Sequence, residues 1–315
     1  MNEILISPQV SLELFLSSLV LLFLSFALYH TLYILLRYDK NATNALQYEL
    51  EKRSLLTTTI IKVALLISIF LFILFVLSID TLAELIPGAM CGAGVVNSGI
   101  YGSLLIALKF IVIVLAIFWI QVDEEDQKAK GFPYFSLKMY LYIFLYLLIA
   151  LSWFLELNFF MSLSVEEPVL CCSNLYTSQT TSFMLGMSIE EIVVAFYITY
   201  LFILLATYLK KKVFLSLLSI LFLYLSYITI VYFFSTYIYE LPTHKCPYCI
   251  LAKEYYFIGY FIYGVLVMAN YYVLYGVVFS FKEHTKSKII TAYTLFVVLV
   301  SFKYIYYFLS NNLFL

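Results

Sequence analysis

Eight apolar segments, each about as long as a membrane-spanning helix, constrain this chain more than any other feature. They cover roughly residues 10–36, 55–78, 103–121, 135–157, 184–209, 213–238, 257–280 and 289–308. The hydrocarbon core of a bilayer is spanned by about 20 apolar residues in a helix. A backbone in lipid must satisfy its own hydrogen bonds, and the alternation of polar and apolar residues typical of a barrel is missing. The sequence therefore predicts an all-α, polytopic membrane protein with about eight transmembrane helices.

Composition agrees with a lipid environment and excludes some partners. Of the 315 residues, 64% are hydrophobic and 12% are charged, against roughly 45–50% and 25% in soluble proteins. The net charge of −1 does not indicate binding to nucleic acid. Membrane lipid is the expected partner. The links between spans are too short for a separate soluble domain. We therefore expect residues 1–315 to form a single transmembrane bundle.

Basic residues are concentrated in one set of links. That set carries Arg37, Lys40, Lys52, Arg53, Lys128, Lys130, Lys210, Lys211, Lys212, Lys282, Lys286 and Lys288, whereas the opposite links carry only Lys245 and Lys253. The positive-inside rule places the basic set in the cytoplasm. An even number of spans then puts both termini outside. We expect a multi-pass protein of the cell membrane, which is the inner membrane in a Gram-negative cell.

All five cysteines fall in three of the predicted outer links. They are Cys91, Cys171, Cys172, Cys246 and Cys249. Each of these links contains a glutamate and a proline, with a cysteine four residues after the proline: Pro87 and Cys91, Pro168 and Cys172, Pro242 and Cys246. This pattern suggests repeated hairpins over residues 55–121, 135–209 and 213–280. The alternative is coincidence, because proline commonly follows the end of a helix.

The sharpest motif is Cys246-Pro247-Tyr248-Cys249. Two thiols three residues apart share a face if a helix starts there, and Pro247 suits its first position with Cys246 as the cap. The positive end of a helix, with His244 nearby, favours the thiolate form of Cys246. The motif predicts that Cys246 attacks a disulfide and that Cys249 resolves the product.

The motif also carries a resemblance. The tetrad resembles that of glutaredoxins, and the cysteine layout resembles the DsbB and vitamin K epoxide reductase families of membrane thiol oxidoreductases. Those families centre on four helices, half the number predicted here. The resemblance implies that Cys246 and Cys249 are the pair next to a quinone. It also implies that a second pair, from Cys91, Cys171 and Cys172, faces an extracytoplasmic thiol protein.

Two further functions and one structural role compete with this hypothesis. The five thiols and His244 are also suitable ligands for a soft ion such as copper, zinc or mercury, which predicts metal binding or transport. The adjacent cysteines favour a metal slightly, since a disulfide between neighbouring residues is strained. Alternatively, two structural disulfides staple the outer links. The last alternative is that the protein serves as a non-catalytic membrane subunit of a larger complex.

Charged and aromatic residues inside the spans supply two weaker hypotheses. Lys109 lies within the span 103–121, and an unpaired charge there costs at least about 2.5–3.5 kcal/mol. We therefore expect an ion pair with Glu156, Glu190 or Glu191, either structural or able to move protons. The tyrosine-rich stretches 224–232 and 271–275 suit a quinone pocket.

Overall fold

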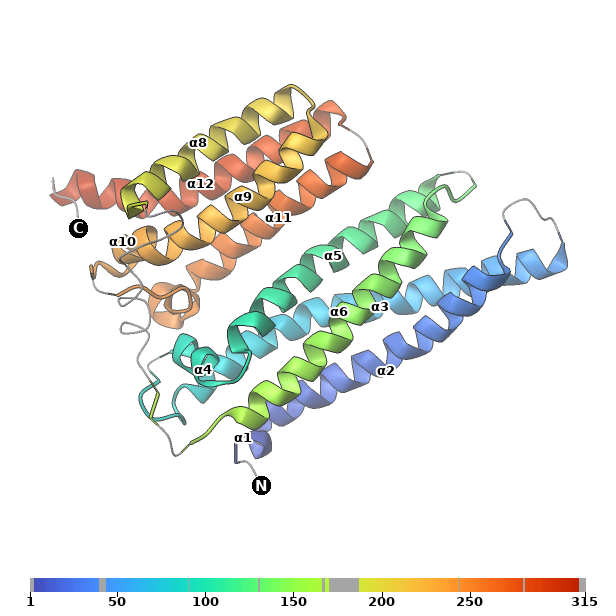
Figure 1. Ribbon diagram of the computed structural model, residues 1–315, viewed down its shortest axis with the longest axis horizontal. Helices are drawn as coiled ribbons and strands as arrows, with labels where there is room; N and C mark the ends of the chain where they lie inside the picture. The colour runs from blue at the N-terminus through green and yellow to red at the C-terminus, as the bar shows by residue number, and fades with distance from the viewer. Residues whose placement is uncertain are drawn as a thin grey trace. The chain divides into compact units, whose positions relative to one another are not determined.

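The computed structural model describes residues 3–39, 44–89, 91–129, 131–165, 168–169, 187–242, 244–279 and 281–311. Over these residues the chain forms helices and no β-strand (Figure 1). Eight of the described helices are long and apolar enough to cross a membrane. The prediction of an all-α, multi-pass membrane protein is confirmed.

The chain divides into two compact units, each described here by itself. Unit 1 comprises residues 1–85 and 96–167, and unit 2 comprises residues 86–95 and 168–315. Unit 1 contains α1 (Glu3–Ile6), α2 (Pro8–Arg37), α3 (Ala45–Leu82), α5 (Gly102–Lys128) and α6 (Phe135–Ser162). Unit 2 contains α8 (Ile189–Tyr208), α9 (Lys212–Thr229), η2 (Ile230–Phe234), α10 (Ser235–Tyr239), η3 (Cys249–Leu251), η4 (Lys253–Tyr255), α11 (Ile258–Val278) and α12 (Glu283–Asn311). The short helix α4 (Gly92–Ser98) begins in unit 2 and ends in unit 1.

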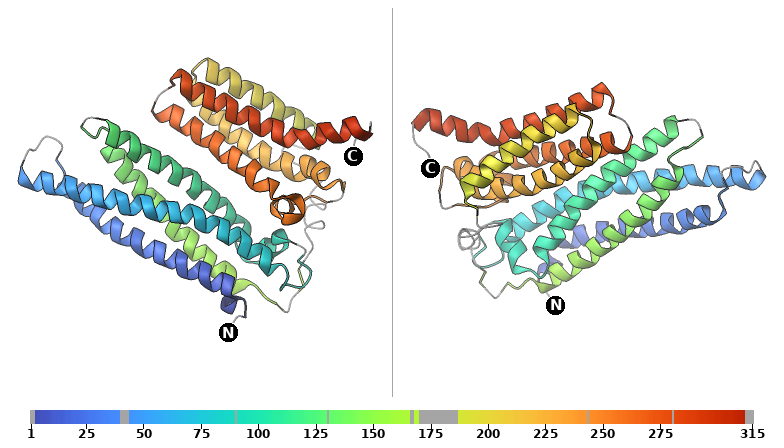
Figure 2. Two further views of the ribbon diagram at one scale, coloured as in Figure 1. Left: turned by 180° about the vertical axis from the view of Figure 1, so that it is seen from behind. Right: turned by 45° about the horizontal axis from the view of Figure 1, so that its top comes forward.

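Each unit is built on four long helices. In unit 1, α2 packs on α3 and α6, and α5 packs on α3 and α6. In unit 2, α8 and α11 each pack on both α9 and α12 (Figure 2). The closest pairs are neighbours in sequence, as expected where the connecting link is short. The predicted single bundle and threefold hairpin repeat stay predictions.

Local sequence explains where several helices begin. Asn44 caps α3 by accepting a hydrogen bond from the backbone of Gln47 at 3.0 Å. Ser188 and Glu191 form a reciprocal capping box at the start of α8, which satisfies two backbone donors that a helix leaves open. Helix α3 starts at Ala45, well before its apolar span, because the preceding Leu, Gln, Glu, Lys and Arg residues are good helix formers.

Each four-helix unit has its own core and an apolar outer surface. The core of unit 1 gathers around Leu24, Ile61 and Trp119, and that of unit 2 around Phe196 and Phe222, whose rings stack 4.9 Å apart. Large apolar side chains also point outward along the helices, among them Leu22, Phe154, Leu201 and Phe302. Such a surface is stable in lipid and not in water.

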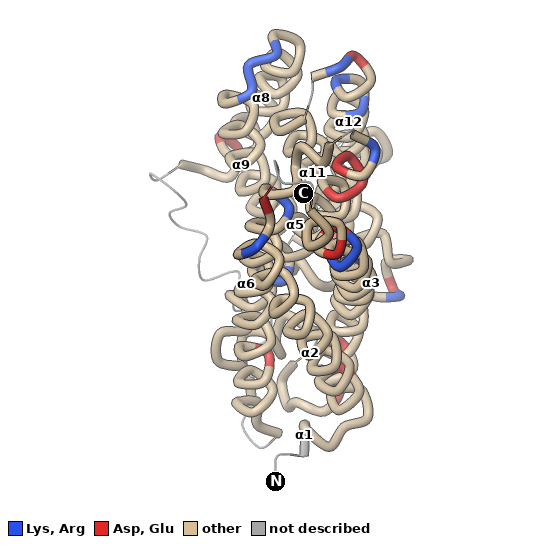
Figure 3. The backbone as a smooth tube through the Cα atoms, turned by 90° about the vertical axis from the view of Figure 1, so that its right-hand side faces the viewer, with Lys and Arg blue, Asp and Glu red and all other residues tan. Residues whose placement is uncertain are grey.

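Charged residues are grouped in short segments of the chain, so that most of each long helix carries no charge. Figure 3 shows this along the backbone tube. Some charged side chains are buried. At the start of α6, Lys138 forms ion pairs with Asp123 and Asp126, which lie near the end of α5. Buried charges of opposite sign neutralise one another where water is excluded.

Candidate functional site

The segment between α10 and α11 carries the Cys246–Cys249 motif in an irregular conformation. Helix α10 ends at Tyr239, and the next residue, Glu240, adopts a left-handed backbone with φ of 55°. Pro247 and Tyr248 form a turn that leads into η3, a 3₁₀ helix of three residues. The expectation of a helix starting at Pro247 and capped by Cys246 was wrong. The backbone is extended at Ala252 and left-handed at Tyr256 and Phe257, so the next long helix begins only at Ile258.

This geometry removes one argument for an acidic Cys246. A helix terminus attracts a thiolate because many aligned peptide dipoles add up. Three residues of 3₁₀ helix supply little of that field. Any activation of a thiol here must come from neighbouring side chains instead.

Cys91 reaches the motif from a glycine-rich turn just before α4. Gly88 has φ of 83°, and a Cβ there would meet the carbonyl oxygen of Val169 at 2.4 Å. The backbone N–H of Val169 donates to the carbonyl of Pro87 at 2.9 Å. Only glycine permits this close approach with that backbone conformation. The turn is therefore packed, and it holds Cys91 inside the core of unit 2.

The structure brings Cys91, Cys246 and Cys249 together. The sulfur atoms of Cys91 and Cys246 are 3.4 Å apart although the residues are 155 positions apart in sequence. All three sulfur atoms lie within 4.8 Å of one another. Cys91 and Cys246 are buried, and Cys249 is partly exposed. The Cys91–Cys246 separation exceeds the S–S bond length of about 2.05 Å, so these two sulfur atoms are in contact without being bonded.

His244 contacts Cys249 rather than Cys246. Its Nε2 atom lies 3.2 Å from the Cys249 sulfur, and its ring packs edge-on against Tyr239 with centroids 4.6 Å apart. An imidazole in this position can take the proton of the thiol and stabilise the thiolate. Burial raises the pKa of the neighbouring Tyr255 phenol, and negative charge at Cys249 raises it further. Tyr255 is therefore a neutral neighbour of the site at physiological pH.

Tyrosines hold the backbone of the motif in place. The hydroxyl of Tyr239 donates to the carbonyl of Cys246, and that of Tyr263 donates to the carbonyl of Pro247 at 2.9 Å. Tyr239 closes α10, directly after the π-helical turn η2. A π-helical turn inserts an extra residue and changes the direction of later side chains. Tyrosines of α10 and α11 thus hold the backbone of the motif at Cys246 and at Pro247.

The other sequence predictions for this site have different outcomes. Cys171 and Cys172 lie outside the described residues. The tyrosines proposed for a quinone pocket include Tyr224 and Tyr227, which are exposed on α9, and Tyr271, which is buried in α11. The quinone pocket stays a prediction.

Two buried ionic groups lie in unit 1, and only one was predicted. The expected pair of Lys109 and Glu156 is present, with Nζ and Oε2 3.0 Å apart. The cluster of Asp123, Asp126 and Lys138 was missed. The sequence does contain a pattern that indicates this cluster. Two aspartates three residues apart lie on the same face of a helix, and a lysine follows in the next helix.

Comparison of the chain with protein-family models, with curated proteins and with solved structures found no match. The case for a function therefore comes from the arrangement of the residues themselves.

Proposed function

We propose that the protein is an integral membrane thiol–disulfide oxidoreductase whose reacting groups include Cys91, Cys246 and Cys249. The observation that carries this proposal is the convergence of three sulfur atoms within 4.8 Å. Two links far apart in sequence supply them, and both belong to unit 2. The four long helices of unit 2 also match the helix number of the families that the cysteine layout resembles. On the topology expected from the basic residues, the site faces the extracytoplasmic side.

The roles of the two motif cysteines are reversed relative to the expectation from sequence. A partner must reach the residue that it joins, and Cys249 is the less buried of the two motif cysteines. Cys249 also has the imidazole of His244 beside it. We therefore assign Cys249 as the sulfur that joins the partner. Cys246 is the sulfur that is displaced when the mixed disulfide forms, and it resolves the mixed disulfide when the reaction runs in reverse.

In the oxidising direction the site begins as a disulfide between Cys246 and Cys249. A thiolate of an extracytoplasmic partner attacks the Cys249 sulfur, the intramolecular S–S bond breaks, and Cys246 leaves as a thiolate that takes up a proton. A second partner thiol loses its proton and attacks its own sulfur in the mixed disulfide. The partner then leaves with a new disulfide, and the departing Cys249 thiolate is stabilised by His244.

The site has gained two electrons, and it has gained two protons once the Cys249 thiolate also takes up a proton from water. A quinone is the acceptor that the resemblance implies, and it would leave as quinol while the disulfide re-forms. Cys91 offers a second exchange that needs no external electrons. Its thiolate attacks the Cys246 sulfur, which gives a buried disulfide between Cys91 and Cys246 and releases Cys249. Cys171 and Cys172 remain candidates for a further pair.

Alkylation at graded pH tests the assignment. Among the three described cysteines, we expect Cys249 to react fastest at about pH 6, because it is the least buried of them and has an imidazole beside it. His244→Gln should slow this reaction, and the matched change His284→Gln, at an exposed histidine on α12, should not. A Cys246→Ser variant should accumulate a mixed disulfide at Cys249. Equal reactivity of the three thiols, or a mixed disulfide that forms only at Cys246, contradicts the assignment.

A soft-metal site is the second candidate, and one observation favours it. Three thiols form a compact set of sulfur donors, and the His244 ring adds a nitrogen beside one of them, Cys249; zinc and copper(I) prefer these donor types. Mass-tag counting separates the two functions. A bound metal protects three described thiols at once and appears in elemental analysis, whereas a disulfide protects two and yields to a reductant.

A further inference from the structure

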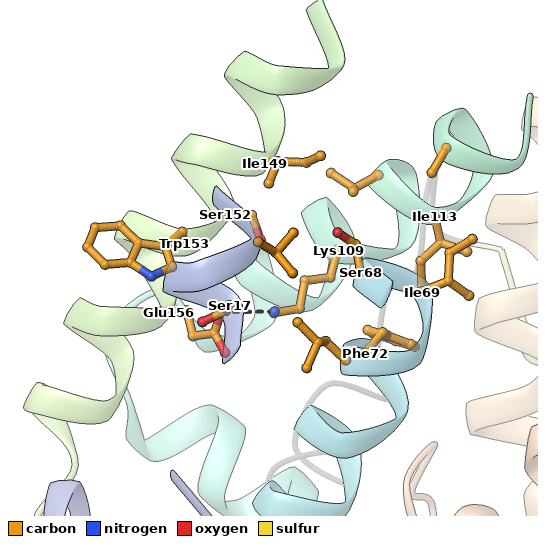
Figure 4. Close-up of a pocket in the computed structure, with 14 residues that line it drawn as sticks. Ser17, Ser68, Ile69, Phe72, Lys109, Ile113, Ile149, Ser152, Trp153 and Glu156 are labelled. Atoms are coloured by element: carbon orange, nitrogen blue, oxygen red, sulfur yellow. Dashed lines mark hydrogen bonds and ion pairs between the residues drawn. The ribbon is translucent and has the colours of Figure 1, made fainter. Parts of the chain in front are cut away.

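Three charged side chains converge inside unit 1, away from the cysteines. They are Glu13 on α2, Lys109 on α5 and Glu156 on α6, each within a few turns of the helix end nearest to it. Both glutamates are only 1% exposed. The ammonium of Lys109 lies 3.0 Å from Oε2 of Glu156, and Figure 4 shows the two side chains pointing at each other.

The carboxylates outnumber the ammonium group. If all three groups are ionised, the cluster carries a net charge of −1 in a region that excludes water, which is costly. Neither oxygen of Glu13 accepts a hydrogen bond from a described donor, and nor does Oε1 of Glu156. The charges that act on Glu13 are those of Glu156 and Lys109, and the two carboxyl groups are close enough to share a hydrogen bond once one of them carries a proton.

Lys109 keeps the positive charge in place. Its Nζ atom lies 4.4 Å from the centre of the Phe75 ring on α3, where a cation is attracted by the face of the ring. Helix α3 otherwise faces the cluster with Ser68, Ile69 and Phe72, which carry no charge. The group that can change its charge is therefore the pair of carboxyls.

A small cavity with a mostly apolar lining and a few polar groups adjoins the cluster. Its volume is about 50 Å³, and Glu156, Lys109 and the hydroxyl-bearing Ser17, Ser68 and Ser152 are among its lining residues. A cavity holds a water molecule once about 10–15 Å³ is available to it and polar partners are present. Glu156 therefore has both an oxygen open to a ligand and a space from which water can deliver a proton.

We propose that Glu13, Glu156 and Lys109 form a membrane-embedded proton-binding site, in which the two carboxyl groups share one proton that exchanges with water in the cavity. On binding, a water-borne proton forms an O–H bond with one carboxylate, and that group then donates to the other. The cluster becomes neutral. On release, the proton returns to water and the net charge of −1 reappears.

Infrared spectroscopy of the full-length protein in lipid nanodiscs tests this proposal through the C=O stretch of a protonated carboxyl group. We expect wild type to show a buried band of this kind at neutral pH that shifts in D₂O and disappears as the pH rises. Glu13→Gln and Glu156→Gln should each abolish the band, because one carboxylate beside Lys109 stays ionised. Lys109→Met should roughly double it, since both carboxyls are then protonated. Glu124→Gln, at a half-exposed glutamate of the same unit, should leave it unchanged.

Three outcomes would overturn the proposal. A wild-type spectrum without the band at neutral pH shows that the proton is not bound, whatever the variants do. A band that persists in both glutamine variants comes from another residue. A band that sodium ions remove at constant pH identifies a metal cation as the ligand instead.

Discussion

Replacing Lys138 by methionine should destabilise the protein far more than replacing any exposed lysine. The ammonium of Lys138 lies 2.7 Å from Oδ2 of Asp126 and 3.2 Å from Oδ1 of Asp123. All three side chains are no more than 2% exposed. Lys138→Met leaves two carboxylates buried without their counter-ion. The hydrogen bonds that they retain, from the backbone of Tyr134 and the amide of Gln127, cannot neutralise them.

The expected magnitude follows from burial rather than from distance. Removing one partner of a buried ion pair typically costs about 3–5 kcal/mol, because the remaining charge stays desolvated. The pair of Lys62 and Glu124 is equally short, at 2.8 Å, but its side chains are 33% and 40% exposed. Exposed pairs contribute about 0–1 kcal/mol. Lys62→Met is therefore the matched control, since Glu124 is the neighbour of Asp123 on α5.

The chain carries its own reporter for this measurement. The indole of Trp119 is buried and donates to the backbone carbonyl of Lys138 at 2.8 Å. The sequence contains two tryptophans, so a Trp153→Phe background leaves Trp119 as the single fluorophore. Unfolding by sodium dodecyl sulfate in mixed micelles, followed by its fluorescence, gives the free energy of unfolding of each variant.

A rescue experiment makes the reasoning refutable. Combining Lys138→Met with Asp123→Asn and Asp126→Asn removes all charges together, and most of the lost stability should return. Equal costs for Lys138→Met and Lys62→Met would refute the argument from burial. So would a triple variant that remains as unstable as Lys138→Met alone.

Further predictions concern helix positions near the thiols. Gly259→Ala should loosen the thiol segment and speed alkylation of the buried cysteines, because the new methyl carbon would stand 2.8 Å from the carbonyl oxygen of Ile250. Gly264→Ala meets nothing within 4 Å and should instead stabilise α11 by roughly 0.5–1 kcal/mol, so a similar response to both changes would contradict the packing argument. Ser188→Ala should cost about 1 kcal/mol of unfolding free energy, since it removes the cap of α8; an unchanged unfolding curve would argue against the capping box.

The sequence alone determined the parts of this protein that depend on neighbouring residues. Hydropathy over about 20 residues identified the membrane-spanning helices, because each helix satisfies its own backbone in lipid. The cost of an isolated charge in a span predicted a partner for Lys109. Three glutamates were candidates for that partner, and only the packing of α5 against α6 shows that it is Glu156.

Tertiary structure decided which thiols meet and what surrounds them. The pairing of Cys91 with Cys246 joins links 155 residues apart, and nothing local in either link encodes that distance. His244 precedes both motif cysteines in the sequence, so the sequence left open which of them it contacts. The structure places its ring beside Cys249. Local sequence sets secondary structure through short-range sterics and hydrogen bonds. The geometry of a reactive site depends on how distant helices pack, which follows from the shapes of many side chains at once.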